Sequence, residues 1–227
     1  MPQASARPSS FRTGLKAGLV FALPGFALAV SFGVLTQTLG WGAVAPILSS
    51  IVVFSGSAQF AIADVLGAGG SAVAAIAAAI LVNARFAPMG VALAPSLKGS
   101  RLRRAFEAQA TVDSSWAIAN RGGGRFDREL MLGATLPQAV AWIGGTAVGV
   151  FAGDTIGDPA SLGLDVVFPA FFLGLLLDEL RNGRDHVGAA AIGGGIALAL
   201  IPLTPPGIPV VAACVGALIA LRERRAR

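Results

Sequence analysis

The chain has 227 residues, of which 55% are hydrophobic and 13% charged, and its mean hydropathy is +0.74. The charged share is about half that of an ordinary soluble domain, so the composition excludes a protein whose whole surface faces water. The net charge of +5 lies mostly between apolar segments and at the two ends. This pattern is typical of membrane orientation rather than of nucleic-acid binding.

Long uncharged runs of about 20 residues, the length that crosses a bilayer as a helix, recur along the chain. They lack the period-two alternation of strands, and their Gly and Ala content suits close helix packing in lipid. The predicted fold class is therefore all-α, a polytopic membrane helix bundle with seven to eight membrane segments. The apolar segments lie at 17–39, 43–66, 71–95, 130–152, 160–180, 187–203 and 207–221, and the eighth candidate is 104–120.

The amino-terminal region has some features of a secretory signal. Three basic residues precede the first apolar run, and Ala27-Leu28-Ala29 imitates a cleavage site. The run continues to Leu39, longer than the apolar part of a signal peptide, so we expect a retained span. We expect a cytoplasmic tail at 1–16, a single transport domain at 17–221 and a basic cytoplasmic tail at 222–227.

Orientation follows from where Arg and Lys gather. They cluster before the first span, at 121–128, at 181–184 and at the end of the chain, so these parts and both termini are predicted to be cytoplasmic. Three simple spans in the first half would place the basic stretch 98–104 outside. Either 104–120 crosses as a further element, or an earlier segment is a broken or re-entrant pair.

Short stretches recur in the two halves of the chain in the same order. Ala22-Leu23-Pro24 matches Thr135-Leu136-Pro137, and Val52-Val53-Phe54-Ser55 matches Val166-Val167-Phe168-Pro169. Apolar sequence also produces such matches by chance. They suggest structural repeats at 17–120 and 129–221, which in transporters commonly enclose the substrate site. The charge pattern favours parallel repeats, and an inverted pair stays open.

A polar stretch, Ser55-Gly56-Ser57-Ala58-Gln59, interrupts the second apolar segment. Small polar residues and a Gln are unfavourable in lipid unless they face protein, substrate or water. We interpret the stretch as the break in a discontinuous helix that lines the transport path. The alternative is routine packing at a helix crossing.

A second polar interruption, Asn83 and Arg85, lies inside the third apolar segment. A central Arg costs about 2.5–3.5 kcal/mol on insertion scales, so it needs a partner. It pairs with a carboxylate, binds the carboxylate of a ligand, or extends to the interface. The candidate counter-charges are Asp64, Asp113 and Asp165.

The sequence offers little to catalysis. It has one His and one Cys, and no metal-binding or nucleophile motif. We therefore expect no enzyme, no cofactor and no metal, and favour a transporter. A passive channel, or an exporter of another small solute, is the alternative.

Several motifs resemble the AzlC family, the large subunit of two-component branched-chain amino acid exporters. The resemblance covers about residues 15–221. It rests on Ser55-Gly56-Ser57-Ala58-Gln59-Phe60, Asn83-Ala84-Arg85, Asp113 with Trp116, and the stretch 163–172, which contains Asp165 and Pro169. The family usually has Glu after the Asp at position 113, where this chain has Ser114.

The resemblance implies export of Leu, Ile and Val, and sometimes Met or analogues, across the cytoplasmic (inner) membrane. It also implies coupling to the proton gradient and a small AzlD-type membrane subunit as partner. A zwitterionic substrate needs partners for its carboxylate and its ammonium group and an apolar pocket for its side chain. Arg85 and either Asp113 or Asp165 are the candidates for the charged partners.

Overall fold

Where the structure describes the chain continuously, from residue 9 to 156, it folds into helices joined by turns and short loops. The computed structural model describes residues 9–156, 173–174, 176–177, 180–181, 184–204, 208–209 and 212–213. Within these residues there is no strand beyond one bridge between Asn120 and Phe126, which agrees with the all-α prediction. The elements are α1 Ser10–Thr38, α2 Val44–Val52, α3 Gly56–Gly67, α4 Ala72–Asn83, α5 Phe86–Leu93, η1 Ala94–Ser96, α6 Arg101–Gln109, α7 Asp113–Ala119, α8 Arg128–Ile156 and α10 Arg184–Leu200.

Membrane-spanning length is reached by few of these elements. In the part of the chain that the structure describes, α1 and α8 are long and apolar enough to cross a membrane, and α4 with α5 and η1 forms a third candidate bent by 46° at its break. The predicted segment 187–203 corresponds to α10, a shorter apolar helix. Most of segments 160–180 and 207–221 lies outside the described residues, so the predicted total of seven to eight remains a prediction.

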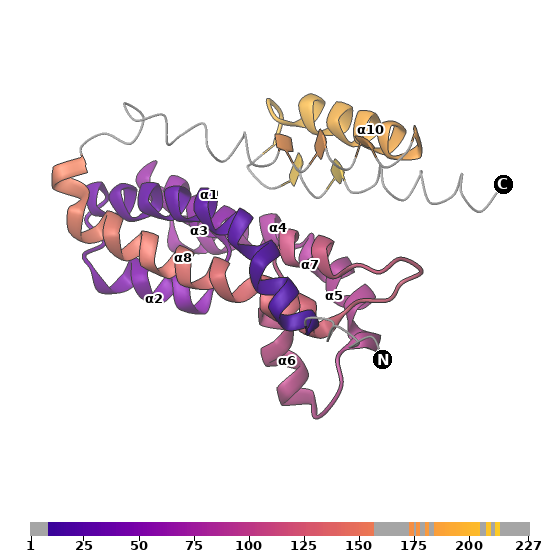
Figure 1. The fold of residues 1–227 in the computed structure, drawn as a ribbon. Coiled ribbons are helices and arrows are strands. Elements are labelled where there is room, and N and C mark those ends of the chain that lie inside the picture. The colour runs from indigo at the N-terminus through magenta and orange to yellow at the C-terminus, as the bar shows by residue number, and fades with distance from the viewer. Residues whose placement is uncertain are drawn as a thin grey trace, which may run out of the picture.

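The helices α1 and α8 lie side by side and run in the same direction (Figure 1). Gly18 lies against Ala134 and Gly33 against Gly149, so the residue numbers rise together along the two helices. A Cβ atom on either of these α1 glycines would collide with the backbone of α8. Small residues therefore set the close approach of this pair. We call the end where both helices begin the basic end, and the opposite end the far end.

The helices α2 and α3 form a hairpin that enters from the far end. Gly67, at the end of α3, lies beside Leu39, which follows the last turn of α1. The tip of the hairpin lies near the middle of α8 instead, where Gly56 packs against Trp142. Segment 43–66 is therefore a re-entrant pair by geometry, which was one of the two alternatives for the first half.

The helices α4 and α5 form one broken element that runs from the far end to the basic end. At the break, Asn83 accepts a hydrogen bond of 2.7 Å from the Ser55 hydroxyl at the hairpin tip. At the basic end, Leu93 packs in a buried cluster with Met131 of α8. Segment 71–95 thus traverses the bundle with a bend at its centre.

The helices α6 and α7 form a second hairpin, which enters from the basic end. In the last turn of α6, Glu107 pairs with Arg128 at the start of α8. Its turn reaches further along α8, where the Thr135 hydroxyl donates to the carbonyl of Ala110 at 2.6 Å. The helix α7 then returns until Ala119 joins the cluster at the basic end. Segment 104–120 therefore does not cross the bundle as a fourth element.

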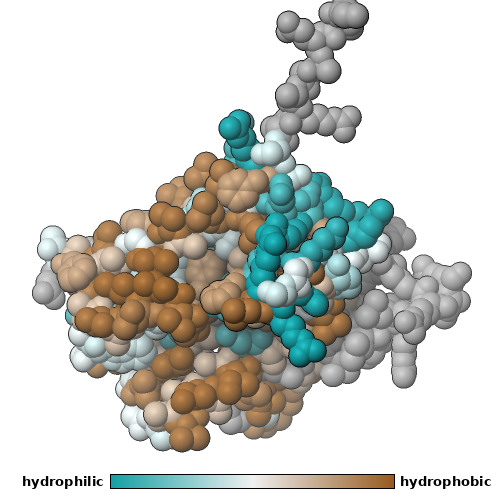
Figure 2. Space-filling model, turned by 90° about the horizontal axis from the view of Figure 1, so that it is seen from below, coloured by the Kyte–Doolittle hydropathy of each residue, from teal (hydrophilic) through white to brown (hydrophobic). Residues whose placement is uncertain are grey.

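The face of the molecule shown in Figure 2 is largely apolar, with hydrophilic residues gathered toward the basic end. An apolar exterior of this kind matches the membrane environment that the composition predicts. Large exposed apolar side chains occur on α1, α2, α4 and α8, among them Leu19, Val20, Leu23, Val44, Val52, Val73, Ile80, Val140 and Phe151.

The predicted repeats are not tested by this arrangement. Pro24 and Pro137 lie inside α1 and α8 respectively, and these two helices are parallel. The other predicted matches fall partly on 166–169, which lies outside the described residues. The repeats at 17–120 and 129–221 therefore stay a prediction.

Candidate functional site

A cavity of about 100 Å³ lies where the two hairpin tips and the break between α4 and α5 meet the middle of α1 and α8. One part of its wall is polar and the other is apolar. The polar lining consists of Ser55, Ser57, Arg85, Asp113, Ser114 and Gln138. The remaining lining consists of Phe21, Gly25, Leu28, Phe54, Gly56, Phe86, Val112 and Trp142.

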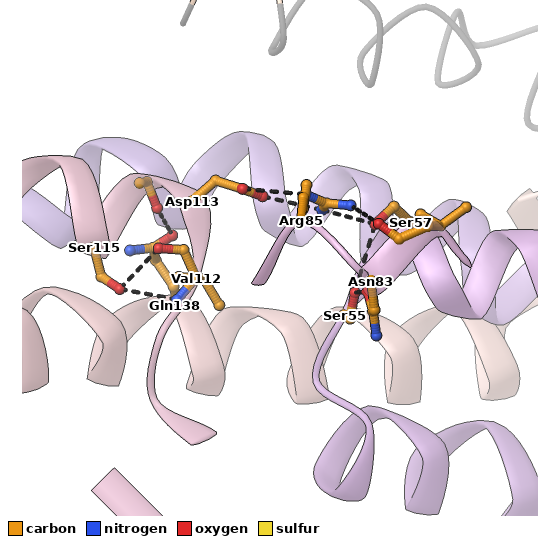
Figure 3. Close-up of polar contacts among 10 residues, drawn as sticks. Ser55, Ser57, Asn83, Arg85, Val112, Asp113, Ser115 and Gln138 are labelled. Atoms are coloured by element: carbon orange, nitrogen blue, oxygen red, sulfur yellow. Dashed lines mark hydrogen bonds and ion pairs between the residues drawn. The ribbon is translucent and has the colours of Figure 1, made fainter. Parts of the chain in front are cut away.

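Arg85 is the centre of the polar wall (Figure 3). Its Nε donates to Oδ1 of Asp113 at 3.2 Å, and its Nη2 donates to Oδ2 at 3.1 Å. The same Nη2 reaches the Ser57 hydroxyl at 2.9 Å, and Nη1 reaches the carbonyl of Val82 at 2.8 Å. The guanidinium also lies 4.7 Å from the centre of the Phe86 ring. The partner that a central Arg requires is therefore Asp113.

This ion pair joins three separate elements. Arg85 precedes α5, Asp113 begins α7, and Ser57 lies in the first turn of α3. The side chains of Arg85 and Asp113 are 19% and 27% exposed, so the pair is partly shielded yet open to the cavity. A bidentate pair in such a setting holds the two hairpin tips at a fixed distance from the broken helix.

The tip of the first hairpin owes its shape to Phe54. This residue has a φ of 43°, a left-handed conformation that bulky side chains rarely adopt. The chain reverses here between α2 and α3, and Phe54 lines the cavity. Strain at this position is therefore located at the candidate site itself.

The helix α3 also carries a buried polar network behind the cavity wall. Gln59 is 1% exposed, and its Oε1 accepts a hydrogen bond of 2.9 Å from the Trp142 indole. Its amide nitrogen donates to the hydroxyls of Ser49 and Ser50. Ser50 in turn bonds Thr146 at 2.8 Å. Gln59 does not line the cavity, but it fixes the indole that does.

Three helix amino termini point toward the cavity, because α3, α5 and α7 all begin at lining residues. The helix dipole gives such an end a partial positive charge, although at α5 the N–H of Ala87 is already bonded to the carbonyl of Ala84. Together with Arg85 they favour an anionic group in the cavity, and Asp113 provides the one carboxylate among the lining residues.

A second ion cluster lies away from the cavity, at the basic end. Glu107 accepts from Nε of Arg103 at 2.8 Å and from Nε of Arg128 at 2.6 Å, and its other contact to Arg128 is shorter still. The hydrogen bonds from Arg128, reinforced by Arg103, outweigh burial and lower the pKa of Glu107 to about 2. This carboxylate is therefore charged throughout the physiological range and ties α6 to α8.

Comparison with known proteins decides the family. A sequence model described as AzlC protein matches residues 21–156, which is more than half of the chain. The chain belongs to the AzlC family. The matched residues contain every lining residue of the cavity.

Relatives of this AzlC chain match it over nearly its whole length. An uncharacterized membrane protein of Archaeoglobus fulgidus is 35% identical over 219 residues, covering 94% of this chain and 95% of that protein. The branched-chain amino acid transport protein AzlC of Bacillus subtilis is 26% identical, with 95% and 88% coverage. The inner membrane protein YgaZ of Escherichia coli is 27% identical, with 96% and 94% coverage. No solved structure matches.

The structure brings most of the predicted site residues of this AzlC protein together. Those that line the cavity are Ser55, Gly56, Ser57, Arg85 and Asp113. Two others do not line the cavity but are hydrogen-bonded to residues that do: Asn83 accepts from Ser55, and Gln59 accepts from Trp142. Asp64, a further candidate counter-charge, is exposed on α3, whereas Asp165 and Pro169 lie outside the described residues. A role of these residues in transport stays a prediction.

Several lining residues were not predicted. Gln138 lies in an apolar segment, the same signal that singled out Gln59, and its Oε1 accepts a hydrogen bond of 2.6 Å from Ser114. Ser114, which the resemblance singled out as a departure from the family pattern, is the donor of this bond. Phe21, Phe54 and Trp142 gave no signal, since aromatic residues in apolar segments are ordinary in membrane helices.

Proposed function

We propose that this chain is the transport subunit of an exporter of branched-chain amino acids, and that the cavity beside Arg85 and Asp113 is its substrate site. Two observations support the substrate class. The cavity combines one cationic and one anionic side chain with an apolar wall, and a relative is named a branched-chain amino acid transport protein.

The observation that carries the proposal is the bidentate pair between Arg85 and Asp113. An amino acid is itself a pair of opposite charges, so it can replace each side chain's partner. Its carboxylate takes the guanidinium of Arg85, and its ammonium group takes the carboxylate of Asp113. The exchange leaves no charge unpaired, which matters because an unpaired buried charge is very unfavourable.

The apolar wall accounts for selectivity within amino acids. Phe21, Leu28, Phe54 and Trp142 line the cavity together with the charged pair. A branched aliphatic side chain buries its methyl groups against these residues, whereas a polar side chain would lose hydrogen bonds to water without replacement.

The arrangement of the hairpins suggests how the site is reached from both sides. We place the basic end and both termini in the cytoplasm, because Arg12, Lys16 and the 121–128 loop belong to that end. The basic stretch 98–104 then also lies on the cytoplasmic side. The conflict with the charge pattern that three simple spans would create in the first half is thereby removed. One hairpin enters from each side and their tips meet at the site, so movement of either hairpin opens the cavity to its own side.

Proton coupling and a partner complete the proposal. Coupling of export to the proton gradient is inferred from the family resemblance. The partner is a small AzlD-type membrane subunit, an inference from the family resemblance that the many Gly and Ala helix faces support. Full export by the purified chain alone in liposomes would contradict the need for a partner.

The test is efflux of preloaded radiolabelled Leu, Met and Lys from cells that express the chain with and without its partner. We expect rapid efflux of Leu and Met, none of Lys, and loss of uphill export when an uncoupler is added. Equal efflux of all three would contradict the proposed substrate class. Efflux that is indifferent to the uncoupler and never proceeds against a gradient would identify a passive channel.

A further inference from the structure

The cavity has a notch in its apolar wall at Gly25, and we infer that Gly25 sets the largest substrate side chain that the site admits. This inference rests on the proposed function, since it assigns the part of the cavity that receives the side chain. It concerns size selection, which neither the family match nor the names of the relatives describe.

Gly25 lies on a stripe of α1 that faces the cavity. Phe21 precedes it by four residues and Leu28 follows it by three, and all three line the cavity. Residues at this spacing lie on one face of a helix. A side chain at position 25 would therefore extend from the same wall, between those of Phe21 and Leu28.

Within the part of the chain that the structure describes, the glycine at this position has no packing role. A Cβ atom at Gly25 would meet no described atom within 4 Å, whereas one at Gly14, Gly18 or Gly33 of the same helix would collide with the backbone of α8. Nor does the backbone require it, because Gly25 lies in regular helix rather than in a left-handed conformation. Glycine weakens a helix relative to alanine, so its presence here maintains open space at a cost in helix stability.

The position of the charged pair orients a substrate toward this notch. Arg85 and Asp113 hold the two charged groups of an amino acid at the polar wall. The side chain then extends toward the apolar wall that contains Gly25. Because the cavity measures only about 100 Å³, filling the notch with one or more methyl groups removes a substantial part of the room for a long side chain.

The experiment compares Gly25→Ala and Gly25→Val with the wild type, each produced with its partner subunit, for efflux of labelled Met, Leu, Val and Ala. We expect efflux of Leu and Met to fall by about tenfold in Gly25→Ala and further in Gly25→Val, because one methylene in an apolar pocket changes discrimination by roughly 10- to 200-fold. Efflux of Ala should fall little or rise. The ratio of the Leu efflux rate to the Ala efflux rate therefore measures the effect of filling the notch.

Gly144 provides a matched control. It also lies in a long apolar helix and does not line the cavity, and a Cβ there also meets none of the described atoms within 4 Å. We expect Gly144→Ala and Gly144→Val to keep the wild-type ratio of Leu to Ala. Thermal unfolding in detergent should show Gly25→Ala at least as stable as the wild type, so a loss of Leu efflux in it cannot come from misfolding.

The outcomes separate the two claims. A wild type that exports these amino acids, together with Gly25 variants that keep its ratio of Leu to Ala, would overturn the notch and leave the proposed function intact. A wild type that exports none of the four amino acids would overturn both. A uniform fall for all four substrates would also overturn size selection, because a notch discriminates by length.

Discussion

The two hairpins reach the same point from opposite ends but are held by different forces. The α2–α3 hairpin is fixed by uncharged hydrogen bonds, in which Gln59 links Trp142 of α8 to Ser49 and Ser50. The α6–α7 hairpin is fixed by the ion cluster of Glu107 with two arginines at the basic end. Neutral polar groups anchor the hairpin that enters from the far end, and charges anchor the one that enters from the basic end.

The difference shows that each anchor suits its surroundings. A charged anchor at the depth of Gln59 would carry a large desolvation cost, whereas at the basic end water and neighbouring arginines reduce that cost. Among the cavity-lining residues that the structure describes, charge occurs at the junction where Arg85 meets Asp113. A charged pair beside a cavity is what the proposed zwitterionic substrate requires.

Breaking the junction should have the largest effect. We expect Arg85→Ala to lower Leu export by roughly 100-fold, since truncating one member of a shielded pair costs about 2–5 kcal/mol. Arg85→Lys should insert and fold normally but lose roughly 10-fold, because an ammonium group cannot form the bidentate fork. Export rates normalised to protein amount in the membrane provide the measurement. Wild-type rates from both variants would assign Arg85 a packing role.

Breaking the neutral anchor should cost stability first. Gln59→Leu leaves the Trp142 indole N–H without its acceptor, and we expect a loss of about 1–3 kcal/mol of unfolding free energy in detergent. Trp142→Phe removes the donor instead. Applied together, the two changes should cost less than the sum of their separate effects, because they remove the same bond. Strict additivity would mean that the bond is not made.

Breaking the charged anchor should have a smaller effect that depends on pH. The partners of Glu107, Arg128 and Arg103, are 26% and 59% exposed, so solvent screens the cluster and we expect Glu107→Gln to cost on the order of 1 kcal/mol at neutral pH. The folded pKa of Glu107, about 2, lies below its ordinary value of 4.5, so its contribution to stability is present above about 4.5 and is lost as the pH falls toward 2.

Unfolding of the wild type and Glu107→Gln should therefore be compared at pH 7, 4 and 2.5. The difference between them should be constant down to about pH 5 and then shrink. A difference that stays the same at pH 2.5 would contradict the ion cluster as its origin.

The direct contact between the hairpins should matter least. Gln109 of α6 donates to the carbonyl of Val52 in α2 at 2.9 Å, but this side chain is exposed. We expect Gln109→Ala to cost less than about 1 kcal/mol of stability and to change export less than twofold. A loss as large as that of Gln59→Leu would mean that the hairpins support each other directly rather than through α8.

Much of this arrangement could be predicted from local sequence. Composition indicated helices in lipid, the polar residues from Ser55 to Gln59 marked a helix break, and the cost of Arg85 required a partner. The charge distribution also showed that the first half holds an element other than a simple span. These features are local, because each depends on the free-energy cost of placing the polar or charged groups of one short segment in an apolar solvent.

The side chains that contact Arg85 and Gln59 could not be predicted from the sequence. Asp64, Asp113 and Asp165 were all candidates for Arg85, and the choice of Asp113 follows from the fold, which brings α7 to the break in the broken helix. Gln59 was expected on the transport path, and the structure places it behind the wall, bound to an indole that the sequence did not single out. The notch at Gly25 was likewise hidden among glycines that serve packing.

The most direct test of the central claim is substrate protection of the two hairpin tips. Cys214 is the chain's one cysteine, so Cys214→Ser provides a background in which Ser57→Cys and Ser114→Cys each introduce one reactive thiol. If the cavity between the tips is the substrate site, leucine will slow labelling by a small thiol reagent at both positions, and lysine will slow neither. Active export by both variants with labelling rates that leucine does not change at either position would contradict the account.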